Sequence, residues 1–324
     1  MPGAPVPRDS RGTGPGRAGW PRVREPFDEY AQVTVNGGVL NVARAGPTPS
    51  AAAAVVLAVH GITSSHMAWR AVARELRVDS DVCVLAPDLR GRGRSATLPG
   101  PHGIKAHVLD LVAVLDDAGA DRVLLAGHSM GAHVAARLAV EHPDRAAGVV
   151  ALDGGVVVPQ RLDVLDEQLE TAATPAVDRM EVPASTADDY VARWRSHPAF
   201  ASAWNDDVEA YVRYDMADDG DCARCVVSED AVTADNFELM FDDATRTAMT
   251  RVQAPVRILH ASRGLFDDHE PVLPPSSLED FASARPRTRI ERVKNVNHYT
   301  LLLGDGPGPG RVAAAIREAI HEHG

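Results

Sequence analysis

The chain has 324 residues, 45% of them hydrophobic, so it is long enough for one large domain with a full core, and global disorder is not expected. Its formal net charge is −12, from 33 basic and 45 acidic residues, which argues against a nucleic-acid binder and gives no reason to expect affinity for anionic membranes. No apolar run approaches the roughly 20 residues that a membrane span requires.

The first 27 residues are rich in Pro, Gly and Arg and lack the apolar segment of a signal peptide. We expect residues 1–27 to be a disordered leader and the protein to be cytoplasmic.

The chain has three cysteines. Cys83 lies in an apolar run and is expected to be a buried hydrophobic residue. Cys222 and Cys225 have C-x-x-C spacing, but the sequence lacks a second pair, so we expect neither a metal nor a cofactor.

Strand and helix patterns alternate along most of the chain. Asn36-Gly37-Gly38 separates two short apolar runs and predicts a hairpin. Beyond it, continuous apolar runs predict buried parallel strands, and amphipathic stretches between them predict helices. The expected strands are 54–61, 81–88, 121–128, 146–155, 256–261 and 288–293, and the expected helices are 67–77, 106–120, 130–142 and 310–323. This order predicts an α/β fold with a mostly parallel sheet wrapped by helices.

The alternation is interrupted between residues 155 and 253, where the sequence is richer in acidic and aromatic residues and has helical character. This stretch is too long for a structureless loop. We therefore predict a core formed by residues 28–154 and 254–324, with a helical cap inserted at residues 155–253 before the penultimate strand.

The run "GHSMG" stands between a predicted buried strand and a predicted helix. A serine at such a tight turn exposes its hydroxyl above the sheet edge, and small residues two positions away on each side accommodate the turn. Gly127 and Gly131 are therefore explained by packing, and Ser129 is a candidate nucleophile. The amide of Met130 would start the helix and could donate a hydrogen bond to a developing oxyanion.

Together with three further motifs, this turn resembles the α/β-hydrolase superfamily, over about residues 30–324. "VHGITSS" resembles the family's His-Gly oxyanion loop, which implies that the Ile62 amide is the second oxyanion donor beside Met130. "DLRGRGRS", at 88–95, resembles a loop that braces the site. "VNHYTLLL" matches the late histidine after the last strand, which makes His298 the base. His60 and His128 belong to the turn motifs and are expected to shape them.

The acid that orients the histidine has three candidates. The family order is Ser, then Asp or Glu, then His, and the usual acid follows the penultimate strand. The resemblance favours Asp267 in "ASRGLFDDHEP"; Asp268 differs by one position, and Asp153, after the preceding strand, is the other alternative. We therefore predict Ser129, Asp267 and His298 as the catalytic residues.

These residues predict a serine hydrolase that cleaves a carboxylic ester or lactone of a small to medium apolar substrate through an acyl-enzyme intermediate. The resemblance implies that epoxide hydrolases of this fold carry an aspartate at the serine position, which argues against that activity. C–C bond hydrolases, thioesterases, cofactor-free perhydrolases and a non-catalytic small-molecule receptor remain alternatives. Aromatic residues of the insertion are candidates for lining the substrate pocket, with their own core as the alternative: Trp194, Phe200, Trp204, Tyr211, Tyr214, Phe237 and Phe241.

Overall fold

The structure, a computed structural model, describes residues 26–78, 81–159, 183–218 and 222–323. Its centre is an eight-stranded sheet in the order β1-β2-β4-β3-β5-β6-β9-β10. The strands are β1 (Glu29–Val35), β2 (Gly38–Ala45), β3 (Ala54–Val59), β4 (Val82–Pro87), β5 (Val123–His128), β6 (Ala146–Leu152), β9 (Val256–Ala261) and β10 (Arg289–Val293). β1 and β2 form the predicted hairpin, β2 pairs antiparallel with β4, and the other neighbours are parallel. The predicted fold class is confirmed.

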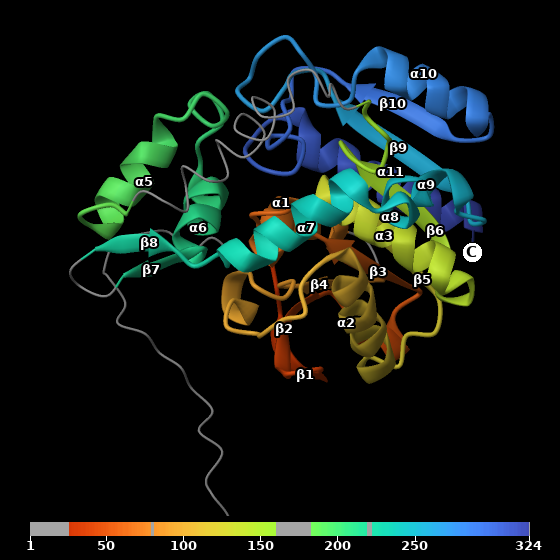
Figure 1. Cartoon of the computed structure of the whole chain (residues 1–324), viewed down its shortest axis with the longest axis horizontal. Coiled ribbons are helices and arrows are strands. Elements are labelled where there is room, and N and C mark those ends of the chain that lie inside the picture. The colour runs from red at the N-terminus through yellow and green to blue at the C-terminus, as the bar shows by residue number, and fades with distance from the viewer. Residues whose placement is uncertain (1–25, 79–80, 160–182, 219–221, 324) are drawn as a thin grey trace, which may run out of the picture.

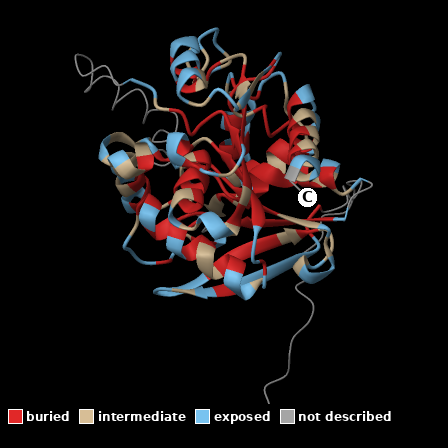
Figure 2. Ribbon diagram, turned by 90° about the vertical axis from the view of Figure 1, so that its right-hand side faces the viewer, coloured by how far each residue is buried: buried red, intermediate tan, exposed pale blue. Residues whose placement is uncertain are grey.

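Helices cover both faces of this sheet (Figure 1). Those outside the insertion are α1 (Arg70–Leu76), α2 (Ile104–Asp117), α3 (Met130–Glu141), α10 (Pro275–Ala284) and α11 (Pro307–His323). One hydrophobic cluster joins the sheet to α1 and α11, and the other joins it to α2, α3 and α10. Figure 2 shows the buried residues concentrated along the strands and on the inward sides of the helices.

The central strands β3, β4 and β6 are apolar throughout because both of their faces are covered. In β3, Val56 and Ala58 belong to the cluster with α1 and α11, whereas Leu57 and Val59 belong to the cluster with α2 and α3. Successive side chains of a strand point to opposite faces, so a strand between two helical layers needs hydrophobic residues at every position. This is the physical reason for the continuous apolar runs in the sequence.

We call the described residues between β6 and β9 the inserted segment. Its elements are α5 (Ala187–Arg195), α6 (Asp206–Tyr214), β7 (Met216–Asp218), β8 (Ala223–Cys225), α7 (Glu229–Phe241), α8 (Asp243–Arg246) and α9 (Ala248–Arg251). The β7–β8 hairpin was not predicted, since its strands are only three residues long and carry no apolar run. Capping side chains mark the starts of the longer helices: Thr186 caps α5, Asn205 caps α6 and Ser228 caps α7.

A buried aspartate paired with two arginines, and a tyrosine hydroxyl, join the inserted segment to the rest of the fold. Asp207 of α6 accepts hydrogen bonds from Arg70 and Arg74 of α1 at 2.6–3.0 Å. The Tyr214 hydroxyl donates to Asp88, after β4, at 2.6 Å. These contacts fix α6 over the carboxyl ends of the central strands.

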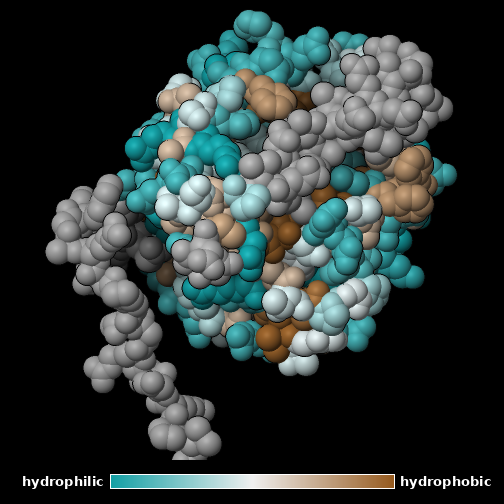
Figure 3. Space-filling model, turned by 60° about the vertical axis from the view of Figure 1, so that its left-hand side comes forward, coloured by the Kyte–Doolittle hydropathy of each residue, from teal (hydrophilic) through white to brown (hydrophobic). Residues whose placement is uncertain are grey.

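From the sequence we expect a disordered leader at residues 1–27, no membrane span and no metal site. Residues 1–25 of the expected leader lie outside the described residues, and Phe27 is buried, its ring centroid 5.1 Å from that of His66. Within the part of the chain that the structure describes, no helix is long and apolar enough to cross a membrane, and no group of three or more His, Cys, Asp or Glu could hold a metal ion. Hydrophilic residues predominate on the face shown in Figure 3, where hydrophobic ones form small separate areas.

Candidate active site

Ser129 lies at a sharp turn between the end of β5 and the start of α3, as the sequence predicts. Its backbone has φ 55° and ψ −122°, a region that residues other than glycine seldom occupy. The Ser129 N–H donates to the Leu152 carbonyl of the neighbouring strand at 2.9 Å, and the Ser129 carbonyl accepts from Ala132 at 3.0 Å. These bonds hold the strained turn in place.

The flanking glycines are required by close backbone contacts. A Cβ at Gly127 would lie 2.2 Å from the Gly131 carbonyl oxygen, and a Cβ at Gly131 would lie 2.3 Å from the Val59 carbonyl oxygen. Real Cβ atoms do not approach backbone oxygens so closely. The pattern of a serine between glycines therefore follows from the packing of this turn against β3 and α3.

His298 follows β10 and contacts a buried aspartate. Its Nδ1 lies 2.7 Å from Oδ2 of Asp153, the residue directly after β6, and Asp153 Oδ1 accepts from the Ala261 amide of β9 at 3.1 Å. Burial raises the pKa of the Asp153 carboxyl, but the hydrogen bond and charge of His298 outweigh it, and the pKa is lowered. A carboxylate on Nδ1 leaves Nε2 of the neutral imidazole free of a proton, as a general base requires.

The predicted pairing of Asp267 with His298 is corrected by this geometry. Asp267 Oδ2 instead accepts from Arg263 at 2.7 Å, and its Oδ1 accepts from the Asn297 amide at 3.0 Å. Asp268 accepts from backbone amides of its own loop, those of Phe266 and Glu270. The resemblance pointed to the loop after β9, whereas the carboxylate that reaches His298 comes from the end of β6.

The predicted oxyanion donors, the amides of Ile62 and Met130, lie in the loop after β3 and at the start of α3. Met130 is the first residue of α3, so its N–H has no carbonyl partner within the helix. The carbonyl of Gly61 accepts from His60 Nδ1 at 2.7 Å and from the Ser64 amide at 3.2 Å. Because the carbonyl and the N–H of a trans peptide point in opposite directions, these bonds turn the Ile62 N–H away from them.

A buried arginine links this loop to the inserted segment, which was not predicted from the sequence. Arg92 Nε donates to the Ile62 carbonyl at 2.8 Å, and its Nη2 contacts Asp235 of α7. His107 Nε2 lies 3.0 Å from the same carboxylate. All three charged or titratable side chains are fully buried. The sequence signal for Arg92 was its place in "DLRGRGRS", but its partner lies 143 residues further along.

Two other histidines near Ser129 are held neutral. Burial lowers the pKa of His60 to about 3, and burial with the nearby charge of His298 lowers that of His128 to about 3. His60 Nε2 accepts from the Leu89 amide at 3.0 Å, which places its proton on Nδ1. His128 Nε2 lies 2.9 Å from the His298 carbonyl oxygen. Both therefore shape the turns around the site, as expected.

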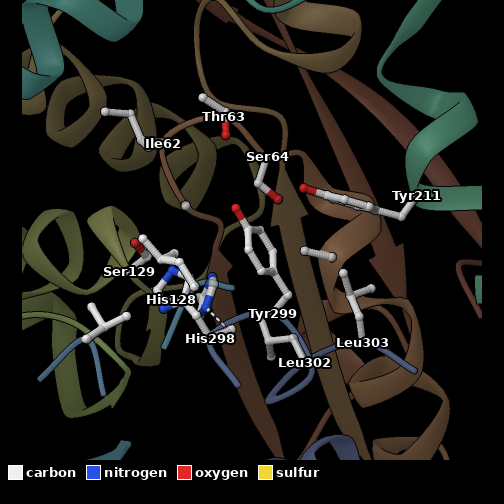
Figure 4. Close-up of a pocket in the computed structure, with 14 residues that line it drawn as sticks. Ile62, Thr63, Ser64, His128, Ser129, Tyr211, His298, Tyr299, Leu302 and Leu303 are labelled. Carbon is white, nitrogen blue, oxygen red and sulfur yellow. Dashed lines mark hydrogen bonds between the residues drawn. The ribbon is translucent and has the colours of Figure 1, made fainter. Parts of the chain in front are cut away.

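A pocket of about 160 Å³ joins these residues (Figure 4). Ser129, His128 and His298 lie along one side of it, and the described apolar residues of its wall are Ile62, Ala68, Leu265, Val272, Leu302 and Leu303. The described polar residues of the wall are Thr63, Ser64, Tyr211 and Tyr299, together with Gly61 of the loop.

Among the aromatic candidates of the insertion, Tyr211 is the one found among the described residues of the pocket wall. Trp194 and Phe200 belong, like Tyr211, to the hydrophobic cluster with α1 and α11, but they are not among the described residues of the pocket wall, as in the alternative left open from the sequence. Phe237 and Phe241 are 63% and 49% exposed. Tyr299 and Ser64 were missed, because a pocket residue next to a catalytic motif has no periodic signal of its own.

Comparison with known proteins assigns the family. The profile of the Alpha/beta hydrolase family matches residues 55–315. The chain belongs to this family. Lipase LipV of Mycobacterium tuberculosis is 34% identical over 191 residues, which cover 52% of this chain and 70% of the lipase. Epoxide hydrolase A of the same organism is 39% identical over 125 residues, and the match covers 37% of each chain. The family and these relatives identify the protein as a hydrolase.

Solved structures of α/β hydrolases share the fold over almost the whole chain. E-2-(Acetamidomethylene)succinate hydrolase aligns with a TM-score of 0.74 at 18% identity, covering 90% of this chain and 99% of its own. A thermophilic esterase from Thermogutta terrifontis aligns with a TM-score of 0.62 at 23% identity, covering 92% of this chain and 100% of its own.

Proposed function

We propose that this protein is a serine-dependent carboxylic ester hydrolase for small to medium, largely apolar esters or lactones. The observation that carries the proposal is the 2.7 Å contact between Nδ1 of His298 and the buried Asp153 carboxylate, in a pocket that Ser129 shares with His298. Under this proposal the acid of the triad is Asp153, and the inserted segment acts as the cap over the site.

In the proposed reaction, Ser129 Oγ attacks the ester carbonyl carbon while His298 Nε2 removes its proton. The Ile62 and Met130 amides stabilise the negative charge on the carbonyl oxygen. His298 then gives the proton to the leaving alcohol, which departs and leaves the acyl group on Ser129. Water, activated by His298, hydrolyses this acyl-enzyme and restores the serine. Asp153 holds the imidazole ring and stabilises its charged form throughout.

Ser129 and one relative favour an ester-cleaving reaction, and the pocket volume indicates the size of the substrate. Ser129 stands where the resemblance implies an aspartate in epoxide hydrolases. The pocket, at about 160 Å³, is smaller than the roughly 300 Å³ or more of typical ligand sites, which favours a short acyl or alcohol group. Lipase LipV, which aligns over 191 residues, is named for an ester-cleaving activity.

The test is hydrolysis of p-nitrophenyl acetate and butyrate by the purified chain, beside thioester, lactone and epoxide substrates. We expect turnover of the esters, labelling of the protein by a fluorophosphonate, and loss of both in Ser129→Ala. Failure of the wild-type chain to turn over any ester and to be labelled would refute the proposal and favour a receptor. Faster turnover of thioesters than of matched esters would move the assignment to a thioesterase.

A further inference from the structure

Ser64 carries a buried hydroxyl group inside the pocket. It follows Gly61 by three residues, and its N–H donates to the Gly61 carbonyl at 3.2 Å, which closes the turn that presents Ile62. The residue is 8% exposed and lines the pocket, and its Oγ has no hydrogen-bond partner among the described residues. A buried hydroxyl without a partner is destabilising, so such groups in native proteins call for an explanation.

Two tyrosine hydroxyls face the same part of the pocket. Figure 4 shows the side chains of Tyr211, from α6, and Tyr299, next to His298, with their hydroxyl groups directed toward that of Ser64. The three residues come from different parts of the chain, so this grouping of hydroxyls exists only in the folded protein. It forms a polar area of the wall that lies apart from Ser129 in Figure 4.

The rest of the wall indicates which kind of group would fit this polar area. Among the described residues of the pocket wall there is no Asp, Glu, Lys or Arg. An ionised group would lose its hydration there without gaining an opposite charge, which is costly. A neutral oxygen can accept a hydrogen bond from a serine hydroxyl without that cost.

Resting on the ester hydrolase function proposed above, we propose that Ser64 donates a hydrogen bond to a neutral oxygen of the substrate, separate from the carbonyl that Ser129 attacks. The preferred substrates are then esters with an ether, hydroxyl or carbonyl oxygen a short distance along the chain, not plain hydrocarbon esters. Because Ser64 and Ile62 belong to one closed turn, the two recognised oxygens are held at a fixed separation.

The test compares two esters of equal length, p-nitrophenyl butyrate and p-nitrophenyl methoxyacetate, in which one CH₂ is replaced by oxygen. Each ester is compared between wild type and Ser64→Ala, so that differences in intrinsic ester reactivity cancel. We expect kcat/KM for the methoxyacetate to fall by about 3- to 10-fold, the effect of losing one hydrogen bond, and kcat/KM for the butyrate to change by less than about twofold. Ser64→Cys keeps the side-chain volume but is a weak donor, and it should reproduce the loss.

Ser65→Ala is the matched control. Ser65 Oγ is also buried without a partner among the described residues, but Ser65 is not among those that line the pocket. This variant should leave the ratio of the two kcat/KM values as in wild type. An unchanged ratio in Ser64→Ala and Ser64→Cys, with both esters hydrolysed by wild type, would overturn the Ser64 assignment alone. If wild type hydrolyses neither ester and is not labelled by a fluorophosphonate, the proposed hydrolase function itself fails.

Discussion

Asp153 contacts His298 through one carboxylate oxygen and the Ala261 amide through the other, at 2.7 and 3.1 Å. Asp153 is 1% exposed, and its backbone φ is 48°. Because it directly follows β6 and accepts a hydrogen bond from β9, these strands fix the position and the orientation of its carboxylate. A carboxylate held in this way can keep an imidazole in one tautomer and stabilise its charged form.

Replacing Asp153 by alanine is therefore expected to lower kcat for ester hydrolysis by about 10³-fold or more, because the imidazolium formed in the reaction loses its buried counter-charge. KM should change much less, since Asp153 is not among the described residues that line the pocket. Steady-state kinetics with p-nitrophenyl butyrate measure both constants.

Asp267→Ala is the control for this prediction. Asp267 accepts hydrogen bonds from Arg263 and from Asn297, the residue before His298 in the chain. We expect kcat to stay within about tenfold of wild type, the effect of a slightly misplaced loop. A loss in Asp267→Ala as large as that in Asp153→Ala would return the acid to the position predicted from the sequence.

Local sequence patterns were sufficient for most of the fold. The buried strands are continuous apolar runs because helices cover both sides of the sheet, and this requirement is visible in the sequence. The turn at Ser129 was equally visible, since Gly127 and Gly131 have no room for a Cβ. Such features depend on residues close together in the chain.

Long-range pairings were not visible in this way. The acid could have come from the loop after β6 or from the loop after β9, and both loops supply an aspartate with positive φ. The choice depends on which loop reaches the His298 ring, which is a property of the folded sheet edge. The contact between Arg92 and Asp235 also could not be predicted, because no local sequence pattern around either residue indicates the other.

Asp235→Asn tests the link between the inserted segment and the Ile62 loop. The substitution leaves the fully buried guanidinium of Arg92 without its carboxylate, and Arg92 also holds the Ile62 carbonyl. We expect kcat to fall by about 10-fold or more, as a misplaced oxyanion donor would cause, and the free energy of unfolding to fall by about 3 kcal/mol or more. Kinetics and urea unfolding of the same preparation measure the two effects.

Asp243→Asn is the matched control, because Asp243 begins α8 close in sequence but is exposed, and its pair with Arg246 is at the surface. It should leave kcat unchanged and alter the free energy of unfolding by less than about 1 kcal/mol. If kcat in Asp235→Asn matched wild type while stability fell, Arg92 would hold the fold without affecting the Ile62 amide.

Stability should decrease on mild acidification because His60 and His128 are buried in the neutral form. Each has a pKa of about 3 in the folded protein, against 6.5 in an unfolded chain. Below pH 6.5 the unfolded state binds more protons, so the free energy of unfolding falls with pH, by about 1.4 kcal/mol per pH unit for each histidine, down to the folded pKa. Urea unfolding at pH 7, 6 and 5 measures this slope.

His128→Gln removes one of these two buried histidines while keeping a side-chain amide that can donate to the His298 carbonyl. Its stability should therefore depend less steeply on pH between 6.5 and 5 than that of wild type. His321→Gln, at an exposed position of α11, should keep the wild-type slope. Equal slopes in wild type and His128→Gln would show that His128 is not held neutral by burial.

Asp207 is expected to be the main anchor of α6, because it receives both Arg70 and Arg74 and is buried together with Arg70. Asp207→Asn removes the carboxylate charge that the buried Arg70 contacts at 3.0 Å, whereas Arg74 is 40% exposed and can turn to water. The free energy of unfolding should fall by about 3 kcal/mol. The neighbouring Asp206 is exposed and lies in the same first turn, so Asp206→Asn should lower the free energy of unfolding by less than about 1 kcal/mol.

Limited proteolysis adds a local measurement. In Asp207→Asn, cleavage within α6 should precede global unfolding. Equal cleavage rates in both variants would show that the arginine pair does not hold this helix.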